Sequence, residues 1–127
     1  MNIRRSVIFA LLSLGFLSGC GGDETEDIDR LEKEAREFYD KGKYREAKAI
    51  MTSAYAAFER LEVKEKAKRV SYLRLLCNIS NALQESEKAI DYATEVAILA
   101  LTDDDRGFAY NALGLAYGNK GEYDKAL

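Results

Sequence analysis

The sequence of 127 residues contains no histidine, no proline, no tryptophan and only two cysteines. Without histidine there is no general base for a Ser-His-Asp or Cys-His arrangement and no histidine ligand for zinc. Without proline, no residue removes a backbone donor from the interior of a helix. The formal net charge is −3, which is not the basic balance of a nucleic-acid-binding protein. These absences exclude several enzyme classes and favour uninterrupted helices.

The N-terminus carries an apolar run, residues 7–17, behind Arg4 and Arg5. A spanning helix needs about 20 apolar residues, so this shorter run is typical of the apolar core of a signal peptide. It ends on Leu17-Ser18-Gly19-Cys20. This tetrapeptide resembles the lipobox of bacterial lipoproteins, which implies attachment of diacylglycerol to the Cys20 thiol and cleavage before it. The alternatives are a signal peptide that merely contains a cysteine, or a cytosolic chain with an apolar start.

The lipoprotein resemblance divides the start of the chain into a signal peptide, residues 1–19, and an acidic, glycine-containing tether, residues 20–27. It implies a protein held on a membrane through acylated Cys20, in the bacterial cell envelope and facing the periplasm or the cell surface. Gly21 directly after the lipidated cysteine favours the outer membrane over the inner one. With Cys20 acylated, Cys77 is left alone and no intrachain disulfide is available.

The rest of the chain is helical in pattern, with apolar residues three and four positions apart. No alternating, strand-like segment competes with this pattern, so the expected fold class is all-α. Gly42 suits the left-handed position after the first helix. Thr102 and Asp105 have capping-box spacing at the start of the fifth helix. The expected helices are 28–40, 44–61, 64–83, 86–101 and 103–117, with a turn at 118–121 and a sixth helix from 122.

Helix pairs at a steady interval suggest an internal repeat. The third pair contains Tyr110-x-x-Leu113-Gly114-x-x-Tyr117-x-x-x-Gly121-x-Tyr123-x-x-Ala126, and this spacing resembles the tetratricopeptide repeat. The first pair shares the later half of the motif, Phe38-x-x-x-Gly42-x-Tyr44-x-x-Ala47. The middle pair is degenerate: Leu76-Cys77 and Ala89 match, but the turn glycine and tyrosine are missing.

The resemblance implies an α-solenoid over residues 28–127, built from repeats at 28–61, 64–101 and an incomplete 103–127. Matching alanines are 89 − 47 = 42 and 126 − 89 = 37 residues apart. Both intervals exceed the 34 residues of the basic repeat, which longer helices would absorb. A generic bundle of helical hairpins is the alternative. Because the last repeat is incomplete, we expect the chain to be a fragment of a longer repeat protein.

Proteins of this family bind peptides or partner proteins along the first helix of each pair and are not catalysts. Accordingly we expect no catalytic residue, metal or cofactor, and a protein or peptide partner rather than nucleic acid. Arg74 and Asn78, one turn apart, could hold a carboxylate, as a lysine and an asparagine do in the family's carboxylate-clamp members. Ala112 stands where that clamp needs a polar donor, and a solvated polar face is the alternative. The candidate groove residues are Arg36, Tyr39, Arg74, Asn78, Asn81, Asn111 and Leu115.

Two other features have simpler interpretations than catalysis. Cys77 lies on the apolar stripe of its helix without a histidine, which favours a core residue over a nucleophile. The acids at 103–105 could be a cation site, but acids also stabilise the start of a helix.

The expected function is a lipid-anchored scaffold for protein–protein interaction in the bacterial envelope. The alternative is the N-terminal sensor or regulatory module of a longer signalling protein with an effector domain after Leu127. An envelope enzyme or glycan-binding lipoprotein is a third possibility, without a catalytic pair to support it.

Overall fold

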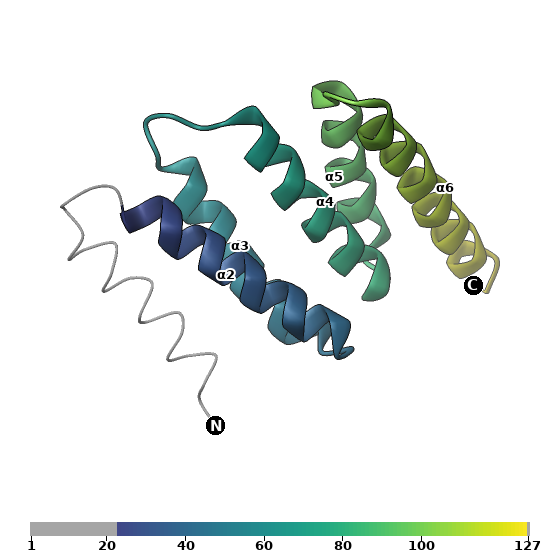
Figure 1. Ribbon diagram of the computed structural model, residues 1–127. Helices are drawn as coiled ribbons and strands as arrows, with labels where there is room; N and C mark the ends of the chain where they lie inside the picture. Colours follow the sequence, from purple (N-terminus) through teal and green to yellow (C-terminus); the bar gives the residue numbers. More distant parts are fainter. Residues whose placement is uncertain (1–22, 127) are drawn as a thin grey trace. The chain divides into compact units, whose positions relative to one another are not determined.

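The computed structural model describes residues 23–126, with side chains described for 24–121. In this part of the chain the regular elements are all helices, joined by turns and without a strand, as Figure 1 shows. The expected all-α fold class is confirmed. Residues 1–22, which hold the expected signal peptide and Cys20, lie outside the described residues. The helices are α2 (Asp23–Asp40), α3 (Tyr44–Glu59), α4 (Lys66–Ala82), α5 (Ser86–Leu99) and α6 (Asp103–Ala126).

The chain divides into two compact units, Met1–Lys64 and Glu65–Leu127. In the first unit, α2 and α3 pack against each other as an antiparallel pair (Figure 1). Each helix buries a stripe of apolar residues three and four positions apart, as an amphipathic helix does. The stripes are Ile28, Leu31 and Ala35 on α2, and Ala47, Ile50, Met51, Ala54 and Phe58 on α3.

In the second unit, α5 packs against both α4 and α6, and α4 also contacts α6. Figure 1 shows α4 and α6 running in the same direction, with α5 returning between them. Small side chains line the contact and are at most 6% exposed. We call this set the small-residue seam: Cys77 on α4, Ala89 and Ala93 on α5, and Ala112 and Ala116 on α6.

Each complete helix pair turns through the same backbone motif. After α2, the N–H groups of Gly42 and Lys43 donate to the carbonyls of Tyr39 and Phe38, both at 2.9 Å. After α4, the N–H of Gln84 donates to the backbone carbonyl of Asn81 at 3.1 Å, and the N–H of Glu85 donates to that of Ser80 at 2.8 Å. These are the two hydrogen bonds of a Schellman motif, which needs a left-handed residue.

That left-handed position is filled by Gly42, with φ 78°, in the first turn and by Gln84, with φ 61°, in the second. The expected role of Gly42 is confirmed. The middle pair, which lacks the turn glycine, forms the same turn at some backbone cost, because a left-handed conformation is unfavourable for residues with a Cβ.

The expected turn at 118–121 is wrong, because α6 continues as one helix to Ala126. A glycine inside a helix costs about 1 kcal/mol and does not by itself end the helix. Lys120, which lies within the expected turn, instead contacts α5, where its Nζ lies 2.5 Å from an oxygen of Glu87. The expected sixth helix is therefore the end of α6.

The start of α2 also differs from expectation. Residues 23–27, expected to belong to the flexible tether, form the first turns of α2. Acids are favourable at a helix N-terminus. Asp27 also accepts a hydrogen bond from Arg30, one turn later, at 2.7 Å. Across residues 23–126, no helix combines the length and the apolar character needed to cross a membrane.

The two turns predict opposite effects of substitution on stability. Gly42→Ala should lower the free energy of unfolding by about 1 kcal/mol, because alanine disfavours the left-handed region. No atom lies within 4 Å of the added Cβ, so the change isolates the backbone effect. Gln84→Gly should raise the free energy of unfolding by about 0.5 kcal/mol, since relief of strain exceeds the entropy cost of glycine. Urea denaturation followed by circular dichroism measures both, and a loss of stability in Gln84→Gly would contradict this account of the turn.

Candidate functional site

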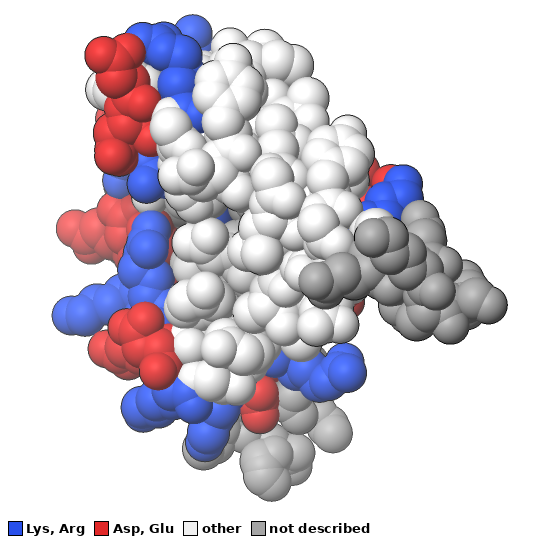
Figure 2. Space-filling view, turned by 90° about the vertical axis from the view of Figure 1, so that its right-hand side faces the viewer, with Lys and Arg blue, Asp and Glu red and all other residues white. Residues whose placement is uncertain are grey.

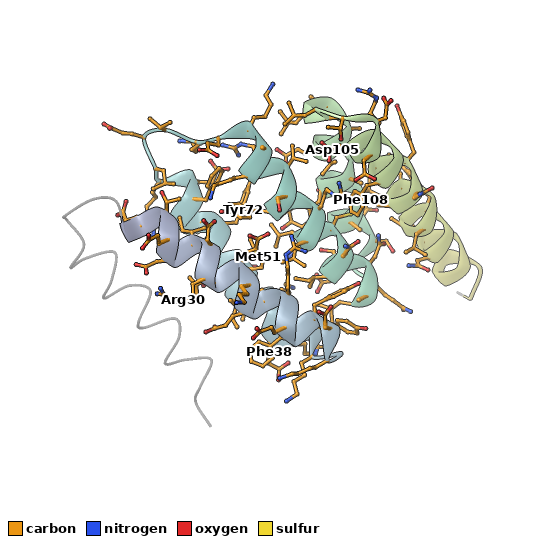
Figure 3. The ribbon with its side chains drawn as sticks, in the orientation of Figure 1. Arg30, Phe38, Met51, Tyr72, Asp105 and Phe108 are labelled. Carbon is orange, nitrogen blue, oxygen red and sulfur yellow. The ribbon has the colours of Figure 1, made fainter. Side chains whose placement is uncertain are left out.

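Arg74, a candidate groove residue on α4, is bound by carboxylates at the start of α6. Its Nη1 donates to Asp105 at 2.8 Å and to Asp104 at 3.0 Å. Its guanidinium carbon lies 4.5 Å from the centre of the Phe108 ring, a cation–π distance. Figure 3 shows Asp105 and Phe108 on the side of α6 that faces α4. An external carboxylate at Arg74 would therefore compete with two carboxylates of the chain itself.

The sequence around Thr102 holds Asp105 in place for this contact. Thr102 precedes α6, and its hydroxyl oxygen accepts the backbone N–H of Asp105 at 3.1 Å. The Asp105 carboxylate in turn accepts the backbone N–H of Leu101 at 3.2 Å. The expected capping box is confirmed, with one difference. In the usual box the carboxylate accepts the N–H of the N-cap residue, here Thr102, whereas the Asp105 carboxylate accepts the N–H of Leu101, one residue earlier.

Burial and hydrogen bonding act in opposite directions on Asp105, whose side chain is 12% exposed. Burial by itself would raise the pKa of the Asp105 carboxyl. Hydrogen bonds from Arg74, Leu101 and Thr102, with the charge of Arg74, outweigh that effect and hold the pKa below its usual value. Asp105 therefore stays ionised as the acceptor for Arg74. Asp104, by contrast, is 83% exposed.

Asn81, a second candidate groove residue, also ties α4 to α6. It is 8% exposed, and its Nδ2 donates to the backbone carbonyl of Ala112 at 3.5 Å. Its Oδ1 is buried without a hydrogen-bond partner. The contacts Arg74–Asp105 and Asn81–Ala112 both join residues 31 positions apart. An equal offset at two points means that α4 and α6 run parallel in a fixed register.

The remaining candidates of the second unit lie along these two helices. Asn78 is half-buried on α4, and Asn111 and Leu115 are exposed on α6, Leu115 at 55%. Asn111 and Leu115 follow Phe108 at intervals of three and four residues, so they share its α4-facing side of the helix. The structure thus brings three candidates, Asn78, Asn111 and Leu115, to the accessible border of α4 and α6. Arg74 and Asn81 lie in the contact between α4 and α6 itself.

Arg36 and Tyr39 lie in the other unit, on α2. Arg36 is exposed and pairs with Glu32, one turn earlier, at 2.7 Å. The ring centre of Tyr39 lies 5.2 Å from that of Tyr44 on α3. Burial, followed by the neighbouring Tyr44 and Asp40, raises the pKa of the Tyr39 hydroxyl above its ordinary value. Tyr39 therefore stays neutral near pH 7. Its ring packs against that of Tyr44, beside the turn between α2 and α3.

Cys77 is a core residue, as expected from the sequence. Its side chain is fully buried in the small-residue seam, and its sulfur donates to the Ala89 carbonyl at 3.4 Å. Burial raises the pKa of the Cys77 thiol to about 11. A thiol that stays protonated at neutral pH is a poor nucleophile. Within the described side chains, no three acidic or thiol groups come together to hold a metal ion.

Sequence reasoning did not identify Phe108 and Asp105 as the groups that hold Arg74. It attributed the acids at 103–105 to the start of a helix, which is correct for Asp105. The available signal was the spacing of Asp104, Asp105 and Phe108 over one turn, which places two carboxylates and a ring on adjacent positions. Pairing that cluster with Arg74 needs the register of α4 and α6, which no local pattern encodes.

Comparisons with known proteins identify no relative. A scan of family models, a search of curated proteins and a search of solved structures each found no match.

The Arg74 contact predicts acid-sensitive stability. Because folding lowers the pKa of Asp105, its contribution is present above the ordinary value of about 3.9 and is lost as the pH falls through the folded pKa. Asp105→Asn should therefore lower the free energy of unfolding by about 1–2 kcal/mol at pH 7, and the difference from the wild type should shrink towards pH 3.

Asp104→Asn is the matched control, since it removes the exposed carboxylate from the same Arg74. Its effect should stay below about 0.5 kcal/mol at either pH. Chemical denaturation at pH 7, 5, 4 and 3 measures both variants. The account would be contradicted if both variants lost the same free energy of unfolding at pH 7. It would also be contradicted if the difference between Asp105→Asn and the wild type stayed the same at pH 3.

Proposed function

We propose that the chain is a lipid-anchored, tetratricopeptide-type scaffold of the bacterial cell envelope that binds a protein segment along α4 and α6. The observation that carries the proposal is the parallel register of α4 and α6, with α5 returning between them. Parallel first helices joined by antiparallel second helices are the arrangement that stacked helix-pair repeats require. The surface between successive first helices is then available to a partner.

The repeated turn supports a repeat origin for the two complete pairs. Gly42 and Gln84 fill the same left-handed position, and 84 − 42 = 42 residues separate them. Ala47 and Ala89, matching alanines of the second helices, are separated by the same 42 residues and are both fully buried. Two independent features at one interval favour a structural repeat over an arbitrary bundle of hairpins.

The accessible residues define the chemistry of the segment that would bind. Asn78 and Asn111 offer amide groups, which can donate to and accept from a peptide backbone. Leu115 adds an apolar contact. Arg74 is engaged by Asp104 and Asp105, so the proposed ligand is held by amide hydrogen bonds and an apolar contact rather than by a carboxylate clamp.

The features that bear on catalysis are consistent with a binding role. Cys77 is buried and protonated. At the start of α6, Asp105 takes part in the capping box of the helix and accepts a hydrogen bond from Arg74. The lipobox-like sequence at Cys20 supports the membrane anchor in this proposal.

Site-specific photo-cross-linking in cells tests the proposal. A photoreactive residue at Asn78 or Leu115 should yield a cross-linked partner at least about fivefold more abundant than one at Thr94, because binding raises the local concentration. Thr94 is an exposed position on α5 and serves as the control. The same variants carrying Cys20→Ser should leave the membrane fraction. Equal adducts at Thr94 would refute the groove, and membrane retention of Cys20→Ser would refute the anchor.

A further inference from the structure

The first unit brings two distant parts of the chain to one end of its helix pair. Because α2 and α3 run antiparallel, the start of α2 lies beside the end of α3, as Figure 1 shows. Residues 60–64 follow α3 and belong to the same unit. They form an irregular loop, which we call the end loop. The start of α2 and the end loop are therefore found at the same end of the pair.

The end loop presents an apolar side chain to solvent. Val63 is 81% exposed, more than any other exposed large hydrophobic residue among the described side chains. Lys64 donates from its ammonium group to the Leu61 carbonyl at 2.6 Å, which closes the loop around the two residues between them. Glu62 and Val63 are thus left at the tip of the loop. An apolar side chain in this position favours any apolar phase that lies next to it.

The proposed lipid anchor places a membrane beside this end. Cys20 precedes Asp23, the first residue of α2, by 23 − 20 = 3 positions. A chain spans at most about 3.5 Å per residue, so the backbone of Cys20 lies within about 10 Å of the start of α2. Acyl chains on Cys20 hold that residue at the bilayer surface. The end loop is then held next to the lipid headgroups.

The length of α2 does not offer a comparable apolar surface. From residue 28 to residue 40, the exposed residues of this helix are all charged: Arg30, Lys33, Arg36, Glu37 and Asp40. Charged groups retain their hydration, so this side of the helix does not enter an apolar layer. The far end of α2 lies about 27 Å from its start, since the helix has 18 residues. An end-on contact satisfies both the tether and the charged side.

We infer that the end loop is a membrane-contact surface: with Cys20 acylated, the α2–α3 pair stands on this end and Val63 enters the interfacial layer of the bilayer. The inference rests on the lipid anchor proposed above and goes beyond it, because it names the protein surface that meets the lipid. Arg60 and Lys64 lie on either side of Val63, and their long side chains suit an interface between apolar and polar phases.

The charges at this end select the kind of lipid. Glu24 and Glu26, at the start of α2, repel a strongly anionic surface, and Glu62 adds a third acid in the end loop. The surface that fits is therefore mainly zwitterionic, such as phosphatidylethanolamine. One valine alone is too little to hold a protein on a membrane. The acyl chains supply the high local concentration that makes this weak contact effective.

Fluorescence quenching by a spin-labelled lipid tests the inference. The acylated full chain is purified in mild detergent and placed in vesicles of phosphatidylethanolamine and phosphatidylcholine that contain this lipid. Val63→Cys carries the fluorophore, and the matched control is Lys41→Cys, exposed just beyond the far end of α2. The chain without an added cysteine gives the background from Cys77. Quenching should be at least about threefold stronger at position 63, because about 27 Å of helix separates the two ends.

A second pair of variants separates entry of Val63 into the lipid from mere proximity. The fluorophore is moved to Glu62→Cys, and Val63 is replaced by aspartate or by leucine. Val63→Asp should reduce quenching at position 62 by about half, because a charged side chain does not enter the apolar layer. Val63→Leu should preserve the quenching, because it keeps the side chain apolar.

Three results would overturn the inference alone while the chain floats with the vesicles. They are equal quenching at positions 63 and 41, quenching at position 62 that Val63→Asp does not change, and stronger quenching at Tyr110→Cys than at Val63→Cys. Tyr110 is 65% exposed on α6, and Figure 2 shows that side of the molecule as a broad uncharged area. Stronger quenching there would mean that α6 faces the lipid. Failure of the wild-type chain to float, as expected only for Cys20→Ser, would overturn the anchor and the inference together.

Discussion

The second unit depends on the close approach of three helices through the small-residue seam. Cys77, Ala89, Ala93, Ala112 and Ala116 are small, and small side chains at a contact let helices pack closely. Close packing brings side chains on α4 to the backbone of α6. The hydrogen bond from Asn81 to the Ala112 carbonyl is the direct consequence. The contact of Arg74 with Asp105 lies at the same 31-residue offset and fixes the same register.

Small residues lie on both sides of α6, in two different surroundings. On its inner side, Ala109, Ala112 and Ala116 are covered by the unit. On its outer side, an added Cβ at Gly107, Gly114, Gly118 or Gly121 would meet no atom within 4 Å. α6 continues to Ala126 without turning, so Gly114, Gly118 and Gly121 all lie within one helix.

Local sequence signals predicted much of this structure. The all-α class, the left-handed Gly42, the Thr102–Asp105 capping box and the buried Cys77 all follow from residues close together in the chain. The failures have two physical causes. The turn at 118–121 was wrong because glycine weakens a helix without ending it, and no proline reinforces the signal. The engagement of Arg74 by Asp105 was missed because it depends on the register between helices that are far apart in sequence.

The reactivity of Cys77 tests the small-residue seam most directly. In the Cys20→Ser chain, Cys77 is the one remaining thiol, and it lies where α4, α5 and α6 meet. Reaction with a small maleimide at pH 8 should be at least about 100-fold slower in the native protein than in denaturant, because the thiol reacts only after the helices separate. Modification at the rate of an unfolded thiol would contradict the seam, and with it the register that places Arg74 and Asn81.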